Sequence, residues 1–161
     1  MYDVTGAEPD GEWFELHNKA SSTRSLAGLT LVDGGNRTHT IKSGTEIAAG
    51  AYVVFVRNRS VSTTAKVPGA ASAYEYGAGL TSSSGIQLAN GSTGAIYLKD
   101  GGTSIAQAPY GGWYTTAGGE SIQLKTLSYA AGGNKSEWCV STSVWSGATD
   151  KGTPGAAGNC P

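Results

Sequence analysis

The stretch Trp13-Phe14-Glu15-Leu16-His17-Asn18 alternates apolar and polar side chains after its first residue. Successive side chains of a β-strand point to opposite faces, so Phe14 and Leu16 would share one face, and Glu15 and His17 the other. Such alternation is typical of a strand with one buried and one polar face. We therefore predict a β-strand here that turns Phe14 and Leu16 into the core.

Similar short runs follow along the chain, separated by glycine-rich turns. The segment 51–56 is the most apolar and predicts a strand buried on both faces. Asp100-Gly101-Gly102 predicts a hairpin, because glycine accepts the positive φ of tight hairpin turns, and Asn90-Gly91 predicts another. Many short strands with such turns indicate an all-β sandwich or barrel. The other predicted strands cover 26–32, 38–41, 85–89, 94–99, 103–107, 121–125 and 137–140.

The chain shows no repeat and no linker, and its 161 residues suit a single domain covering 1–161. One connection, 58–84, is longer than the loops usual in compact domains. It predicts either a short helix or extra strand within it, or a loop that contacts a ligand.

Charge and hydropathy exclude several partners. Charged residues make up 14% of the chain, against about 25% in typical domains. The net charge of −1 gives no reason to expect binding to nucleic acid. No run of 18 apolar residues occurs, so no membrane insertion is expected. Residues 1–18 lack the basic start and apolar stretch of a secretory leader, as in a processed chain.

Two cysteines, Cys139 and Cys160, are 21 positions apart, and neither belongs to a Cys-x-x-Cys pair. Without further ligands nearby, zinc is disfavoured. We predict a disulfide between them, worth about 3 kcal/mol in the chain-entropy model. Disulfides persist in oxidising compartments, so an extracellular or cell-surface location is expected.

The sequence contains no recognisable catalytic constellation. It has no Gly-x-Ser-x-Gly turn and no dinucleotide fingerprint. Glu12 and Glu15 are three positions apart, so in a strand their carboxylates would point to opposite faces and could not flank one bond. We therefore expect no enzymatic activity and no cofactor.

Acidic residues gather near the start of the chain, and a flexible acidic segment can supply the oxygen ligands that Ca²⁺ prefers. The regular spacing of a calcium loop is absent, so a solvated acidic loop is the favoured interpretation and calcium the weaker one. The residues concerned are Asp3, Glu8, Asp10 and Glu12.

Several aromatic residues fall on predicted loops, where such side chains can form a sugar platform or a protein-binding hot spot. Half-buried positions at the edges of a sandwich are the alternative. These possible contacts to a ligand or partner are Tyr74, Tyr76, Tyr110, Trp113 and Tyr114.

Taken in order, six blocks of the chain resemble the lamin tail domain, particularly its bacterial, extracellular branch. The resemblance implies an immunoglobulin-like antiparallel β-sandwich of about seven to nine strands. It also implies an extracytoplasmic role in binding, tethering or structure, without catalysis. The blocks are Gly11–Asn18, Leu26–Asp33, Ile47–Val54, Ile96–Gly102, Gly119–Leu124 and Gly152–Asn159.

Members of this family usually begin with an apolar strand just before the segment that matches residues 1–4, and this chain starts too late to include it. The sequence leaves open whether that strand is encoded upstream, was trimmed away or is absent. A sandwich without it would expose an open edge and an apolar groove, which another chain can fill by strand addition. The residues predicted to form this edge are Tyr2, Val4, Phe14 and Leu16.

Three functions remain in view. The first is a secreted module that mediates protein–protein interaction or anchoring. The second is an extracellular subunit that assembles with copies of itself, as a homo-oligomer or filament, through strand addition at the open edge. The third is a carbohydrate-binding module that uses the aromatic residues named above.

Overall fold

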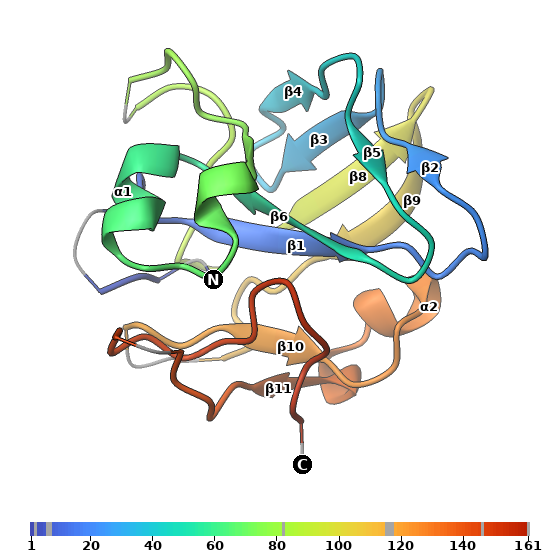
Figure 1. The fold of residues 1–161 in the computed structure, drawn as a ribbon. Helices are drawn as coiled ribbons and strands as arrows, with labels where there is room; N and C mark the ends of the chain where they lie inside the picture. Colours follow the sequence, from blue (N-terminus) through green and yellow to red (C-terminus); the bar gives the residue numbers. More distant parts are fainter. Residues whose placement is uncertain (2, 6–7, 82, 115–117, 146, 161) are drawn as a thin grey trace.

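The computed structural model describes residues 1, 3–5, 8–81, 83–114, 118–145 and 147–160 (Figure 1). It confirms an all-β, immunoglobulin-like sandwich. One sheet has the order β1 (Trp13–His17), β6 (Tyr52–Val56), β7 (Tyr74–Glu75). The other has the order β4 (Thr38–Thr40), β3 (Thr30–Asp33), β8 (Ile96–Asp100), β9 (Thr103–Ala108). Two further pairs join β2 (Arg24–Ser25) to β5 (Glu46–Ile47), and β10 (Ile122–Leu124) to β11 (Trp138–Val140). The short helices are α1 (Arg59–Thr64), η1 (Ala70–Ser72), α2 (Tyr129–Gly132) and η2 (Lys135–Glu137).

Strand β1 forms where the alternating stretch predicts it and pairs antiparallel with β6. Phe14 lies opposite Phe55, and their rings stack with centroids 4.9 Å apart. Both side chains belong to the main core, against which Leu16 also packs. The inward face of the opening stretch is therefore as predicted.

Strand β6 is buried on both faces at its C-terminal end, as its sequence predicts. Phe55 is fully buried in the main core. Its neighbours Val54 and Val56 point the other way, into a second apolar cluster that contains Trp13 and Trp145. Two separate cores thus share this strand.

The predicted hairpin joins β8 to β9, with Asp100 paired to Thr103. Gly101 and Gly102 have φ values of 52° and 90°, which fit the positive φ that tight hairpin turns require. The turn at Asn90-Gly91 makes no second hairpin, because no strand precedes it.

The long connection 58–84 contains both kinds of element that its length suggested. Asn58 caps α1, its side chain accepting a hydrogen bond from the N–H of Val61 (3.2 Å). The chain then passes through η1 into β7, which runs parallel to β6. A parallel neighbour needs a crossover connection, and α1 and η1 provide it. This pair departs from the expected all-antiparallel arrangement.

The strand predicted at 85–89 is absent. Main-chain groups of this segment bond instead to the buried side chains of Glu12, Asp33 and Arg57. The N–H of Leu88, for example, donates to Glu12 (2.8 Å). Buried polar main-chain groups need partners, and here charged side chains supply them where a sheet ladder would normally do so.

The strand predicted at 26–32 is shorter than expected, since β3 begins only at Thr30. A turn precedes it, in which the N–H of Leu29 donates to the carbonyl of Leu26 (3.2 Å). Two neighbouring residues, 24–25, form β2 instead. Apolar composition alone did not reveal this turn.

Candidate functional site

Strand β1 lies at the edge of its sheet and pairs with β6 on one side only. Glu12 and Asn18, just beyond its two ends, both make main-chain hydrogen bonds to the β6 side. Bonded and non-bonded pairs alternate along an antiparallel ladder. The odd-numbered residues Trp13, Glu15 and His17 therefore direct their N–H and C=O groups away from β6, toward the outer edge.

Met1 occupies the first position of this outer edge. The N–H of Trp13 donates to the carbonyl of Met1 (3.2 Å), and the main-chain nitrogen of Met1 donates to the carbonyl of Trp13 (2.7 Å). Exchange of both bonds is the pattern of an antiparallel pair. Among the residues that the structure describes, no main-chain partner meets the outward groups of Glu15 and His17.

Strand β10 presents a second open edge. On the side of β11, the carbonyl of Ser121 accepts a main-chain hydrogen bond, and the N–H of Lys125 donates one to the carbonyl of Glu137 (2.7 Å). By the same alternation, Ile122 and Leu124 direct their main-chain groups away from β11. Within the described part of the chain these groups also have no main-chain partner. Figure 1 shows β10 between β1 and β11, with the arrows of β1 and β10 pointing the same way.

Between these two edges lies a groove of about 340 Å³, lined by residues of both strands and of β9. Its lining is mainly apolar and includes Ile105 and Tyr129, two residues that are 46% and 49% exposed. Exposed apolar surface concentrated at a groove is typical of an interaction site. Other lining side chains are those of Leu16, Leu88, Leu98, Ala106, Ile122 and Leu124.

The residues predicted to form the open edge need correction. Phe14 and Leu16 use their main chains to pair with β6, and contribute only side chains to the groove. Val4 is buried in the second cluster, and its N–H donates to Glu8 (2.8 Å). Tyr2 lies outside the described residues. Residues of a strand alternate in main-chain direction as well as in side-chain direction, and the prediction considered only side chains.

The face of β1 that was expected to meet solvent is instead covered. Trp145 packs its ring against Trp13, and the N–H of Gly155 donates to the carboxylate of Glu15 (2.8 Å). The ring of His17 packs against that of Tyr52 with centroids 4.4 Å apart and planes tilted by 40°. Residues 152–160, which we call the C-terminal arm, provide part of this cover.

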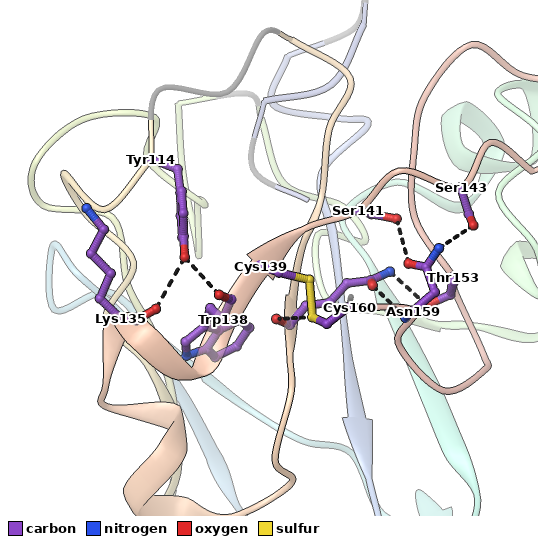
Figure 2. The surroundings of a disulfide bond; sticks show 10 residues. Tyr114, Lys135, Trp138, Cys139, Ser141, Ser143, Thr153, Asn159 and Cys160 are labelled. Carbon is purple, nitrogen blue, oxygen red and sulfur yellow. Dashed lines mark hydrogen bonds between the residues drawn. A yellow bond between two sulfur atoms is a disulfide. The ribbon is translucent and has the colours of Figure 1, made fainter.

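The C-terminal arm also contacts β10. The side chain of Gln123 donates to Thr153 (2.9 Å) and accepts from the N–H of Asn159 (2.9 Å). The predicted disulfide between Cys139 and Cys160 is present and fastens the end of the arm to β11 (Figure 2). The arm therefore bonds to both strands that border the groove.

Two carboxylates, those of Glu15 and Glu12, have raised pKa values. Burial raises the pKa of Glu15 to about 7, against the lowering effect of the hydrogen bond from Gly155. Burial likewise raises the pKa of Glu12 to about 7, although Leu88 donates to it. The two side chains bond to different segments, so the expected divergence of this pair holds in the structure.

The acidic residues considered for calcium have separate partners. Glu8 accepts from Val4, Glu12 is buried against Leu88, and Asp10 lies 3.6 Å from the guanidinium of Arg57. Asp3 instead bonds through its carbonyl to the N–H of Gly119 (2.7 Å). Across the described residues no group of three or more His, Cys, Asp or Glu side chains could hold a metal ion. The interpretation of Glu12 as part of a solvated loop was wrong, since it is only 2% exposed.

The candidate aromatic residues do not form one platform. Tyr76 and Tyr110 are buried in the main core, so the prediction that they contact a surface ligand is corrected. Tyr76 packs against Phe14 with ring centroids 5.6 Å apart. Tyr74 lies in β7, where its hydroxyl bonds to His39 (2.7 Å).

Trp113 and Tyr114 lie near β11. The ring of Trp113 is 6.2 Å from that of Trp138. The hydroxyl of Tyr114 donates to the carbonyls of Lys135 and Trp138 (3.2 and 3.0 Å), as Figure 2 shows. These two aromatics therefore brace η2 and β11.

A family model described as the Lamin Tail Domain matches residues 1–112, more than half of the chain. The chain belongs to the lamin tail domain family. That family consists of non-enzymatic, immunoglobulin-like domains generally involved in protein interactions. A search of the curated proteins finds no matching relative. In the lamin tail domain described here, β10, β11 and the C-terminal arm lie beyond the matched range.

The disulfide fits a protein of an oxidising, extracellular environment. As a separate observation, none of the helices in the described residues is long and apolar enough to cross a membrane.

Proposed function

We propose that this lamin tail domain is a non-catalytic interaction module that binds an extended polypeptide segment in the groove beside β1. The observation that carries the proposal is the coincidence of an open edge, at Glu15 and His17, with a mainly apolar groove. An extended peptide that adds to a sheet edge gains affinity from main-chain hydrogen bonds and specificity from pockets for alternate side chains.

The chemistry of the groove favours a peptide over a sugar. A strand edge offers N–H donors and C=O acceptors at the spacing of a peptide main chain. A sugar platform needs exposed rings, whereas two of the aromatics considered for it, Tyr76 and Tyr110, are in the core.

Self-assembly through the same edge would require a donor strand from a second copy. Each apolar run that the sequence suggested as a strand is, within the described residues, already part of a sheet or packed in the core. None of these runs is therefore free to serve as that donor strand.

We further propose that residues 1–161 act as one unit at an extracellular or cell-surface location, where binding would serve anchoring or structural organisation. The hydrogen bond from Gly155 to Glu15 joins the two ends of the chain, which supports a single unit. The bond between Cys139 and Cys160 supports the location.

The proposal is tested by fluorescence anisotropy with a labelled short peptide of alternating valine and threonine. The parent protein should bind it, and Ala106→Phe, which fills the groove, should weaken binding roughly tenfold or more. Ala71→Phe, at an exposed position of η1 outside the groove, is the matched control and should bind as the parent does. A peptide N-methylated at the amides that face β1 should fail to bind. Equal binding of the methylated peptide would overturn strand addition, whether or not the phenylalanine variant folds.

A further inference from the structure

We propose that Asp3, Thr5 and Asp150 bind a calcium ion that links two segments far apart in the sequence. None of these residues lines the groove beside β1, so the site is separate from the peptide-binding site proposed above. It shares only Asp3 with the calcium ligands considered from the sequence. A hydroxyl takes the place of a third acidic group.

The first observation is a buried carboxylate with an uncommitted oxygen. Asp150 is only 9% exposed. Its Oδ2 accepts a hydrogen bond from the N–H of Thr5 (3.3 Å). Its Oδ1 is buried and has no hydrogen-bond partner within the described part of the chain.

No basic side chain among the described residues neutralises this carboxylate. None of the ion pairs there involves Asp150 or Asp3. Lys151, the next residue, pairs with Glu120 instead (2.8 Å). Burial of a carboxylate is costly unless an opposite charge and further bonds compensate it. The arrangement around Asp150 therefore favours a bound cation.

Gly119 is the point on which two of the oxygens converge. A Cβ on this residue would lie 2.6 Å from Oγ1 of Thr5 and 2.7 Å from Oδ1 of Asp150, which is too close for a real side chain. Gly119 also has a φ of 91°, a conformation that favours glycine. The hydroxyl and the carboxylate therefore face one common space beside this glycine.

Asp3 brings a second carboxylate to the same place. Its main-chain carbonyl accepts a hydrogen bond from the N–H of Gly119 (2.7 Å). One of its carboxylate oxygens lies 3.4 Å from the position that a Cβ on Gly118 would take. On the other side, the N–H of Lys151 donates to the carbonyl of Gly119 (2.6 Å). Main-chain bonds thus hold the segments that carry the ligands next to one another.

The chemistry of these ligands favours Ca²⁺. All three groups bind through oxygen, which hard cations prefer. Ca²⁺ accepts an irregular set of about 6–8 oxygens, with waters completing the shell, whereas Mg²⁺ demands a nearly regular octahedron. Two carboxylates are few for a calcium site, so we expect a Kd on the order of 10⁻⁴–10⁻³ M, the range of extracellular calcium modules.

The test is a titration of the ¹⁵N-labelled full chain with CaCl₂ at constant ionic strength, followed by NMR. The amide signals of Thr5, Gly119 and Asp150 should shift together, with one Kd on the order of 10⁻⁴–10⁻³ M. The amide of Asp100, an exposed acidic residue at the end of β8, is the control and should not move. If the three signals stay fixed at Ca²⁺ concentrations ten times above that range, the proposal is wrong.

MgCl₂ tests the choice of ion. It should need roughly tenfold higher concentrations than CaCl₂ to produce the same shifts, because the ligand set is irregular. An equal response to both salts would overturn the assignment to calcium.

Two variants test the ligands without disturbing the core, since Asp3 is half-buried and Thr5 is exposed. Asp3→Asn should weaken Ca²⁺ binding roughly tenfold, and Thr5→Val should weaken it several-fold. Asp100→Asn removes the same charge as Asp3→Asn at a distant turn and should bind as the parent does. Equal weakening in Asp3→Asn and Asp100→Asn would reveal a general effect of charge and overturn the site.

Discussion

The ring of Trp145 packs edge-on against that of Trp13, with centroids 6.1 Å apart and planes at 74°. Aromatic pairs favour this T-shaped arrangement. Both side chains are buried, and the contact joins a residue late in the chain to the strand that begins the sandwich. The C-terminal segment is therefore part of the core structure and not an appended tail.

Substitution of Trp145 by alanine should lower the free energy of unfolding by about 3–5 kcal/mol, because it removes a large buried side chain from the second cluster. Val144, its neighbour, is 54% exposed, so Val144→Ala should change stability by no more than about 0.5 kcal/mol. Urea denaturation of the two variants provides the comparison. Similar losses in both would show that the cluster does not hold the segment.

Reduction of the disulfide between Cys139 and Cys160 should cost about 3 kcal/mol, given the 21 residues that separate them. The loss should appear as a lower denaturant midpoint in the presence of reductant. A thiol titration of the unreduced, denatured protein should find no free thiol. Two free thiols would contradict both the bridge and the compartment it implies.

Stability should depend on pH through Glu12, whose pKa is raised from 4.5 to about 7 by burial. The folded state holds this proton more tightly than the unfolded chain, so its stabilising contribution is complete below about pH 4.5 and is lost as pH rises through about 7. Glu12→Gln removes this dependence. A tenfold change in proton affinity corresponds to about 1.4 kcal/mol. The free energy of unfolding of the variant, relative to that of the parent, should therefore be higher at pH 8 than at pH 4 by up to about 3 kcal/mol. Thermal unfolding at the two pH values measures this; parallel pH profiles would contradict it.

Arg57 should be necessary for the order of Thr81 and of the segment 83–86. Its guanidinium is buried and donates to the carbonyls of Thr81, Ser84 and Ile86. Arg57→Met leaves these acceptors without their donor and should cost about 3 kcal/mol or more. Limited proteolysis should then cleave the segment faster. Arg24→Met, at an exposed position of β2, is the control and should resist as the parent does.

The sequence predicted the fold class well because its main signals are local. Alternation in β1, the apolar run of β6 and the glycine turn after Asp100 each determine the geometry of a few adjacent residues. The cysteine pair was also predictable, since with only two cysteines a single internal pairing is possible.

The site was only partly predictable, since it depends on contacts between distant residues. The open edge at β1 followed from the resemblance, but its second border, β10, is brought beside it only by the tertiary fold. The bond from Gly155 to Glu15 spans most of the chain. Likewise, the strand predicted at 85–89 failed because three buried charged side chains, far away in sequence, outcompete a sheet ladder for its main chain.

The most direct measurement of the central claim is an isotope-edited NOE experiment on the domain saturated with the valine–threonine peptide. Strand addition to β1 predicts contacts between the peptide's Hα protons and the amide protons of Glu15 and His17. Contacts confined to residues outside the groove, such as Trp113 and Tyr114, would contradict it.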